Sequence, residues 1–183
     1  MIIITGFGPY GQFKKNLSAE LVKKLNLPNY DLPIYRKILP VSWNLSITSY
    51  NHLLINLDSM PEVIILFGIH SHKLYHIEKY GWNFALGNDI ENKWKMGLIQ
   101  YKLSFRLKTT INVEKLFSNL KNRENISISN WAGTYLCNYL YYWALKISNK
   151  QYPVIFIHIP YKENLRSCIK KVEMIIQTII KVL

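Results

Sequence analysis

Two side chains far apart in the chain have the types needed for a nucleophile and its base. Cys137 lies where a predicted strand, Ile126 to Ser129, turns through a glycine into a predicted helix. A thiol in the first turn of a helix lies near the partial positive charge of the unpaired N–H groups, which favours the thiolate. His158 follows an apolar strand, Pro153 to Ile157, so we expect it near the carboxyl end of a neighbouring strand. Ligands and catalytic groups gather at that end of open α/β sheets, so the pair predicts nucleophilic cysteine chemistry.

The pattern leaves a structural alternative open. A lone cysteine in apolar surroundings is usually an inert core residue, and a histidine after a strand is usually hydrogen-bonded scaffolding. Cys168 illustrates this alternative, because it lies in a predicted helix, Asn164 to Leu183, among apolar residues at helical spacing. We expect Cys168 to be a core residue with no chemical role.

Strands and helices alternate along the chain. Apolar or β-branched runs predict strands at Met1 to Thr5, Leu32 to Leu39, Val63 to Phe67 (closed by Gly68), Ile126 to Ser129 and Pro153 to Ile157. Apolar residues at helical spacing predict helices at Leu17 to Leu25, Trp43 to Leu57, Val113 to Leu120, Thr134 to Ile147 and Leu165 to Leu183. The irregular stretch from Ile69 to Leu107 indicates two short strands, around Lys79 to Phe84 and Leu98 to Phe105. This order predicts a single α/β domain over residues 1–183, a three-layer α/β/α sandwich around a mostly parallel mixed sheet.

The chain is basic, with a net charge of +12 and an isoelectric point near 9.6. This charge keeps a nucleic-acid partner in view, because clustered Lys and Arg side chains bind phosphate backbones. Here no run of Lys or Arg is longer than two residues. A nucleic-acid-binding domain therefore stays the weakest of the interpretations.

Cysteine content and hydropathy indicate a cytoplasmic protein. The two cysteines have no zinc-like spacing and are too few for a disulfide framework, which fits a reducing compartment. The apolar start of the chain ends at Gly6, which makes it too short for a signal peptide. No apolar run approaches the ~18 residues of a membrane span, so we expect no membrane partner.

Four separated parts of the chain carry a family resemblance. They are Thr5-Gly6-Phe7-Gly8-Pro9-Tyr10-Gly11 followed by Asn16; Leu39-Pro40-Val41; Ile77-Glu78-Lys79 with Asn83; and Ala132-Gly133-Thr134-Tyr135-Leu136-Cys137-Asn138 with Phe156-Ile157-His158-Ile159-Pro160-Tyr161. In order and approximate spacing they resemble the pyroglutamyl peptidase (pyrrolidone-carboxylate peptidase) family of cysteine peptidases. The match spans nearly the whole chain.

The resemblance implies an α/β/α sandwich that removes 5-oxoproline from the N-terminus of pyroglutamylated peptides, with no cofactor or metal. Cys137 matches the family's nucleophile, His158 its general base and acid, and Glu78 the carboxylate that orients the histidine. These residue types suit the reaction, because a carboxylate that fixes the imidazole tautomer completes a cysteine–histidine pair that works through a thioacyl-enzyme.

The resemblance also implies a substrate pocket, formed by Phe7, Tyr10, Asn16, Val41, Ile69, Tyr135 and Leu136. A 5-oxoproline ring is a flat neutral lactam, so its pocket needs aromatic walls and amide-type hydrogen bonds rather than an acidic residue. Phe7 and Tyr10 resemble the family's ring-clasping aromatics. The alternative is that these two rings only fill the core beneath a turn.

Two positions depart from the family pattern. The stretch Ile69 to Lys73 is bulky where the family is small and glycine-rich, and Asn88 stands near the position of a supporting arginine. These changes keep open a non-catalytic relative that binds a peptide or a small amide.

Other departures concern histidines and assembly. His70, His72 and His76 invite a metal interpretation, but no carboxylate or cysteine lies at a matching spacing, so we expect solvated or capping histidines. The segment from Asn92 to Arg106 and the region before the last predicted helix look shortened, so the family's usual oligomer contacts are not expected, although a homo-oligomer stays possible.

Overall fold

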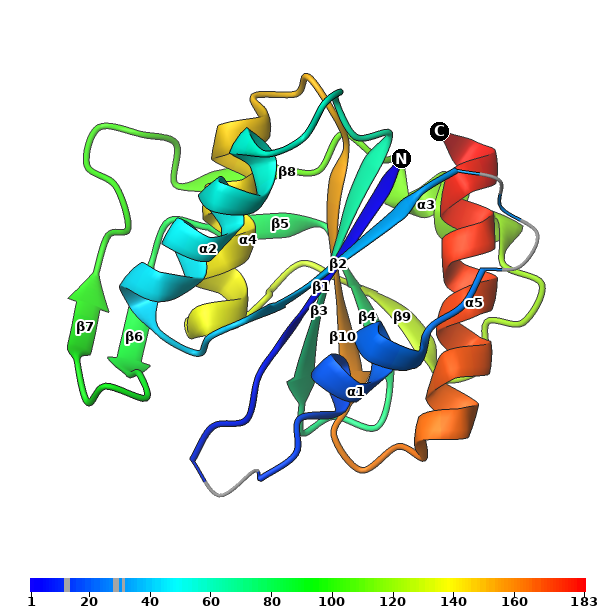
Figure 1. The fold of residues 1–183 in the computed structure, drawn as a ribbon, viewed down its shortest axis with the longest axis horizontal. Coiled ribbons are helices and arrows are strands. Elements are labelled where there is room, and N and C mark those ends of the chain that lie inside the picture. Colours follow the sequence, from blue (N-terminus) through cyan, green and yellow to red (C-terminus); the bar gives the residue numbers. More distant parts are fainter. Residues whose placement is uncertain (12–13, 28–29, 31) are drawn as a thin grey trace.

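A six-stranded sheet forms the centre of the protein in the computed structural model, which describes residues 1–11, 14–27, 30 and 32–183 (Figure 1). Its strands, in the order β2-β1-β3-β10-β4-β9, are Ile34–Leu39, Ile2–Phe7, Val63–His70, Val154–Pro160, Tyr75–Glu78 and Ile126–Ser129. All neighbouring pairs in this sheet are parallel except β10 and β4. The central strands β1, β3 and β10 are buried on both faces and are correspondingly apolar.

Helices cover both faces of the sheet. On one side lie α1 (Leu17–Lys24), α3 (Val113–Asn119) and α5 (Leu165–Val182), and on the other α2 (Trp43–Ile55) and α4 (Leu136–Ser148), as Figure 1 shows. The α/β/α sandwich with a mostly parallel mixed sheet, predicted from the alternation of elements, is therefore confirmed. In the described part of the chain, no helix has both the length and the apolar character that crossing a membrane requires.

Side-chain caps explain where several helices begin. Asn16, Ser42, Asn112 and Asn164 each accept a hydrogen bond from a backbone N–H in the first turn of the helix that follows. Caps of this kind are worth about 1 kcal/mol each. Helix α4 differs, because its N-cap residue Tyr135 makes no side-chain cap hydrogen bond.

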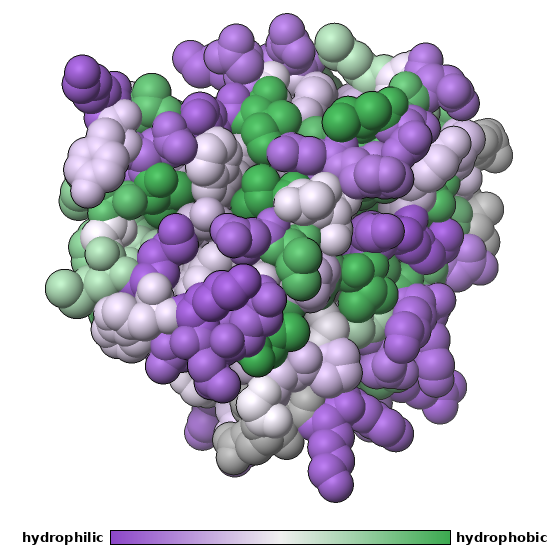
Figure 2. All heavy atoms as spheres, turned by 60° about the vertical axis from the view of Figure 1, so that its left-hand side comes forward, coloured by the Kyte–Doolittle hydropathy of each residue, from purple (hydrophilic) through white to green (hydrophobic). Residues whose placement is uncertain are grey.

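Two small antiparallel ribbons lie outside the main sheet. They pair β5 (Tyr80–Trp82) with β8 (Arg106–Lys108), and β6 (Ala85–Asn88) with β7 (Trp94–Gly97). On the face that Figure 2 brings forward, apolar and hydrophilic side chains are intermixed, and Trp94 and Met96 of β7 are largely exposed. The strand predicted at Lys79 to Phe84 exists as β5, but the one predicted at Leu98 to Phe105 is wrong. That stretch turns at Lys102, whose φ of 60° is left-handed and interrupts an extended chain.

Three predictions about the main sheet also need correction. Strand β3 does not close at Gly68 but continues to His70, because β10 pairs with it as far as that residue. Strand β4 was not predicted, and it lies between β9 and β10. The strands that precede Cys137 and carry His158 are therefore not neighbours, and His158 lies within its strand rather than after it. A four-residue strand with polar side chains at alternate positions gives too weak a pattern for sequence prediction.

The register brings the polar side chains of β10 and β4 to one face of the sheet. His158 is paired with Gly68 of β3 on one side and with His76 of β4 on the other. Glu78 lies in the next row, opposite Phe156. Phe156 packs in the core beneath α2 and α4. Side chains alternate along a strand, so His158, two residues further on, faces the same helix layer, and so do its neighbours His76 and Glu78.

Candidate active site

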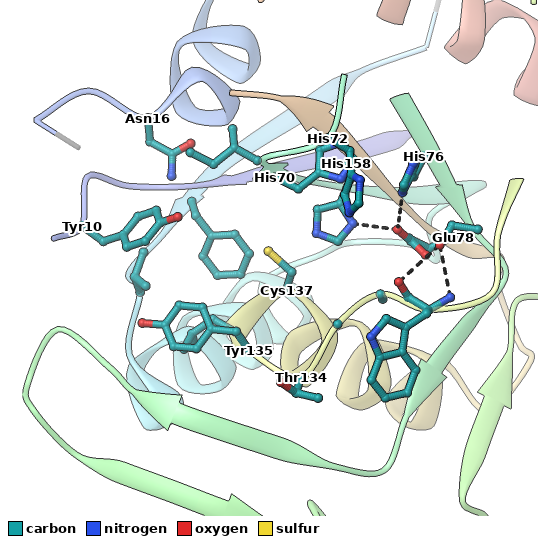
Figure 3. Close-up of a pocket in the computed structure, with 18 residues that line it drawn as sticks. Tyr10, Asn16, His70, His72, His76, Glu78, Thr134, Tyr135, Cys137 and His158 are labelled. Atoms are coloured by element: carbon teal, nitrogen blue, oxygen red, sulfur yellow. Dashed lines mark hydrogen bonds and ion pairs between the residues drawn. The ribbon is translucent and has the colours of Figure 1, made fainter. Parts of the chain in front are cut away.

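A cavity of about 440 Å³ opens where the ends of β1 and β3, the strands β4 and β10, and the N-terminus of α4 meet (Figure 3). All the site residues predicted from the sequence lie in its wall: Phe7, Tyr10, Asn16, Val41, Ile69, Glu78, Tyr135, Leu136, Cys137 and His158. The wall also contains residues that were not predicted for the site, namely Ser129, Trp131, Ala132, Gly133 and Thr134, together with the three histidines 70, 72 and 76.

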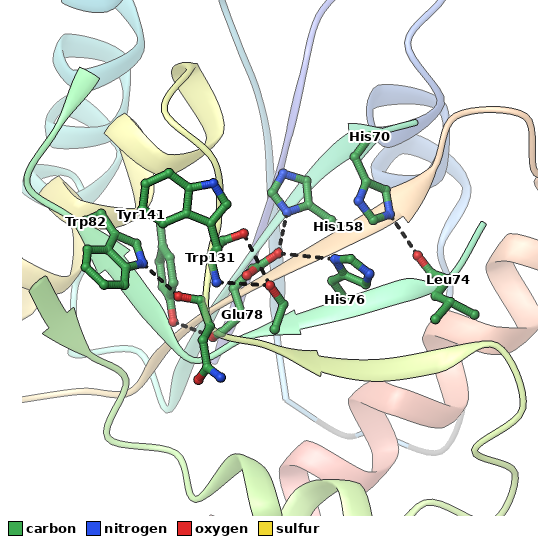
Figure 4. Close-up of polar contacts among 10 residues, drawn as sticks. His70, Leu74, His76, Glu78, Trp82, Trp131, Tyr141 and His158 are labelled. Atoms are coloured by element: carbon green, nitrogen blue, oxygen red, sulfur yellow. Dashed lines mark hydrogen bonds and ion pairs between the residues drawn. The ribbon is translucent and has the colours of Figure 1, made fainter. Parts of the chain in front are cut away.

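Glu78 holds the imidazole of His158. Its Oε1 lies 2.8 Å from Nδ1 of His158, and its side chain is fully buried (Figure 4). The backbone carbonyl of Glu78 accepts a hydrogen bond of 2.9 Å from the hydroxyl of Tyr141, which lies on α4. Because a carboxylate only accepts hydrogen bonds, Nδ1 carries the proton and the other ring nitrogen, Nε2, is left for the cavity.

Cys137 completes a chain of three side chains. It is the second residue of α4, it is half-buried, and its interaction with His158 raises the pKa of that imidazole. Gly133, with a φ of 82°, allows the sharp turn that leads from β9 into α4. Since the side chain of Tyr135 does not cap α4, the N–H groups of the first turn are not satisfied by a side-chain cap.

Opposing influences set the pKa of His158. Burial lowers it, but the charge and hydrogen bond of Cys137, and those of Glu78, outweigh burial and raise the pKa to about 9. His158 is therefore protonated at neutral pH, with Cys137 and Glu78 as the two groups that favour its charged form. Its protonation stabilises the folded state fully below the ordinary pKa of 6.5, and that stabilisation is lost as the pH rises through about 9.

We expect the Cys137→Ala variant to lower the pKa of His158. The substitution removes the sulfur that contributes most to raising the pKa, while burial and Glu78 remain. Titration of the imidazole by NMR in both proteins measures this directly. An unchanged pKa in the variant would show that Cys137 and His158 are not electrostatically coupled.

Aromatic rings form the other end of the cavity. The ring centroids of Tyr10 and Tyr135 lie 6.4 Å apart, and Trp43 packs edge-on against Tyr135 at 5.4 Å. The hydroxyl of Tyr135 donates a hydrogen bond of 2.7 Å to the backbone carbonyl of Asn88. Asn88 thus supports a wall of the cavity through its main chain.

Asn16 and Ser18 hold the end of β1, which carries Phe7. Nδ2 of Asn16 donates to the carbonyl of Gly8 at 3.0 Å, and its Oδ1 accepts from the backbone N–H and the hydroxyl of Ser18. The hydroxyl of Ser18 also accepts a hydrogen bond of 3.0 Å from the N–H of Phe7. Asn16 is almost fully buried, so its main observed contribution is to hold the end of β1 in place.

Three further histidines form a cluster beside His158. The ring of His70 stacks on that of His158, with centroids 5.1 Å apart and 20° between the planes. His76 and His72 contact His70 at 4.5 Å and 5.2 Å. Within the residues that the structure describes, no group of three or more His, Cys, Asp or Glu side chains is arranged to hold a metal ion.

Comparison with known proteins gives the family. The family model described as pyroglutamyl peptidase matches residues 1–183. The chain belongs to this family of cysteine-type omega peptidases. It is 30% identical to a pyrrolidone-carboxylate peptidase of Thermosipho africanus, over 87% of this chain and 81% of the relative, and 28% identical to one of Clostridium botulinum, over 87% and 78%. Its fold is similar to the pyrrolidone carboxyl peptidase of Thermococcus litoralis, with a TM-score of 0.88, 24% identity, and coverage of 98% and 93% of the two chains.

In this member of the pyroglutamyl peptidase family, Gly68 leaves room for the sulfur of Cys137. A Cβ atom at this position would lie 2.6 Å from Sγ of Cys137 and 2.8 Å from the ring of Phe156. We expect Gly68→Ala to displace Cys137, to lower hydrolytic activity more than tenfold and to lower the free energy of unfolding by about 1–3 kcal/mol, as overpacking of a core does. Thermal unfolding and kcat/KM test this. Wild-type values for both would show that the close packing around Cys137 is not needed.

Proposed function

We propose that this protein removes 5-oxoproline from the N-terminus of peptides, with Cys137 as nucleophile, His158 as general acid and base, and Glu78 as the residue that orients His158. The observation that carries the proposal is that Cys137 lies in the wall of one cavity with the hydrogen-bonded pair His158–Glu78, beside an aromatic end, and raises the pKa of His158. Family membership supports the same reaction.

Acylation would start from the thiolate of Cys137. Its sulfur attacks the carbonyl carbon of the 5-oxoproline residue, and the negative charge moves to the carbonyl oxygen. The first-turn N–H groups of α4, which have no side-chain cap, would stabilise that oxygen. As the C–N bond breaks, His158 gives its proton to the leaving amine, and a thioester to Cys137 remains.

Deacylation would use the same groups in reverse. Neutral His158 takes a proton from a water molecule, which attacks the thioester carbonyl. The C–S bond breaks, free 5-oxoproline leaves, and the proton returns His158 to its charged form beside the thiolate. Glu78 stabilises this charged form and keeps Nδ1 protonated throughout.

The cavity wall favours a neutral ring over a charged N-terminus. Phe7, Tyr10 and Tyr135 offer apolar ring faces. Among the residues that line the cavity, Glu78 is the one with a carboxylate, and this carboxylate is buried and hydrogen-bonded to His158. An ordinary α-ammonium group would find no counter-ion there, so burying it would cost free energy that a lactam does not lose.

Turnover of chromogenic amides tests the proposal. We expect pyroglutamyl-p-nitroanilide to be hydrolysed under reducing conditions, and prolyl- and alanyl-p-nitroanilide, which carry an ammonium group, to be hydrolysed at least a hundredfold more slowly. No turnover of the first compound would contradict the proposal. A rise in melting temperature with a pyroglutamyl amide but without hydrolysis would instead indicate the non-catalytic relative.

A further inference from the structure

The cavity has two ends, on opposite sides of Cys137 (Figure 3). The aromatic end carries Tyr10 and Tyr135, and the other end carries the histidine cluster. The proton transfer to the leaving amine decides which half of the substrate lies at which end of the cavity. The leaving amine must lie beside His158, which protonates it, so the residue after 5-oxoproline must extend over the histidine end.

The histidine end presents imidazole rings in fixed positions. Nε2 of His70 donates a hydrogen bond of 2.8 Å to the backbone carbonyl of Leu74, and the same ring stacks on His158 (Figure 4). His72 is exposed in the turn between β3 and β4, and its ring lies 5.2 Å from His70 and 5.1 Å from His76. The cluster therefore offers a surface of planar rings at the mouth of the cavity.

An exposed indole lies on the side of the cavity where Glu78 holds His158. Ser129, which is paired with Glu78, accepts a hydrogen bond of 3.1 Å from the backbone N–H of Trp131. Trp131 is 53% exposed although it lines the cavity. Its ring lies 5.1 Å from that of Trp82, which packs against Phe105 at 5.6 Å and donates a hydrogen bond of 2.8 Å from Nε1 to the carbonyl of Asn130. Trp131 is thus supported from one side by a fixed ring and leaves much of its surface free for contact.

His70 and His76 add little positive charge to this end. Burial, together with the neighbouring His158, lowers the pKa of His70 to about 4, so its ring is neutral at neutral pH. Burial also lowers the pKa of His76, although Glu78 opposes the change. No Lys or Arg side chain, and no carboxylate other than that of Glu78, is among the residues that line the cavity. The histidine end therefore offers mainly the faces and edges of rings, which suit another aromatic ring.

We propose that His72 and Trp131 form a subsite for the side chain that follows 5-oxoproline, and that this subsite favours aromatic side chains. The inference rests on the proposed function, since it places the leaving half of that reaction's substrate. It assigns a role to the stretch from Ile69 to Lys73, which contains His70 and His72.

A matched pair of substrates tests the subsite. Pyroglutamyl-phenylalanine amide and pyroglutamyl-cyclohexylalanine amide differ only in whether the six-membered ring is aromatic, so hydrophobic contact is similar in both. Released 5-oxoproline is measured for each. We expect kcat/KM to be about three- to ten-fold higher for the phenylalanine compound, the range that a favourable ring pair supplies.

Substitutions locate the preference. In Trp131→Leu and in His72→Leu, the ratio of the two kcat/KM values should fall toward one. Each change removes a ring and puts an apolar side chain without a ring in its place. The controls are Trp94→Leu and His52→Leu, exposed residues that do not line the cavity, and they should keep the wild-type ratio.

The outcomes separate this inference from the proposed function. Equal kcat/KM values for the two substrates in the wild type would overturn the subsite and leave the proposed function intact. An equal fall for both substrates in the variants, with the ratio unchanged, would also overturn it, because a purely structural role gives that result. No hydrolysis of either substrate would overturn the proposed function and the subsite with it.

Discussion

Cys137→Ala is expected to lower kcat for a pyroglutamyl amide by at least about ten-thousand-fold, because no other group can form the thioester. The thiol lies in the first turn of α4, lines the cavity and raises the pKa of His158. Loss of a nucleophile in comparable enzymes leaves only the rate that binding and oxyanion stabilisation supply. Steady-state kinetics with the purified variant measure the effect.

Cys168→Ala is the matched control. Cys168 is fully buried in the core formed by α5 and the sheet, and burial is the first of the causes that raise its pKa, to about 12. A thiol in that state is a poor nucleophile. The variant should retain wild-type kcat with some loss of thermal stability. Activity that survives Cys137→Ala but not Cys168→Ala would refute the assignment.

Glu78→Gln is expected to lower kcat by about a hundred- to ten-thousand-fold, with little change in KM. The amide keeps the shape of the side chain but removes the charge that stabilises protonated His158. It also permits an NH₂ group to face Nδ1, which favours the wrong tautomer. In the described residues Oε2 of Glu78 has no hydrogen-bond partner, so the other end of a glutamine amide would gain none.

A second glutamate gives the control for Glu78. Glu114→Gln also removes one carboxylate, but Glu114 lies on α3, pairs with Lys79 and is about half exposed, at 54% for its side chain. Its kcat should stay at the wild-type value. Equal kcat values in Glu78→Gln and the wild type would show that His158 needs no oriented carboxylate.

The order of elements could be predicted from the sequence because most of them obey a simple periodicity. The β-branched runs of β1 and β3 and the helical spacing in α5 place them within a few residues of their observed bounds. Strand β4 escaped prediction because only four residues contribute, and because its partners β9 and β10 come from distant parts of the chain. Register between strands is a tertiary property that local pattern does not encode.

Because local sequence pattern does not encode strand register, only part of the site could be predicted from the sequence. Cys137 and His158 were recognisable from their local context, but Glu78 was indicated only by the family resemblance, because its strand was unrecognised. The contacts of His70 and His76 with His158 follow from the rows in which β3, β10 and β4 are paired. Trp131 lies in the same run as Cys137, and its place in the cavity depends on the turn at Gly133.

Trapping of the acyl-enzyme tests the central claim most directly. A pyroglutamyl ester is mixed with the enzyme, the reaction is stopped with acid within its first turnovers, and the protein is digested and analysed by mass spectrometry. We predict one added pyroglutamyl group on the peptide that contains Cys137, none on the peptide that contains Cys168, and accumulation of the adduct in His158→Ala if the ester acylates that variant. Hydrolysis of the ester with no adduct at Cys137 at any time, or with the group on another residue, would contradict the account.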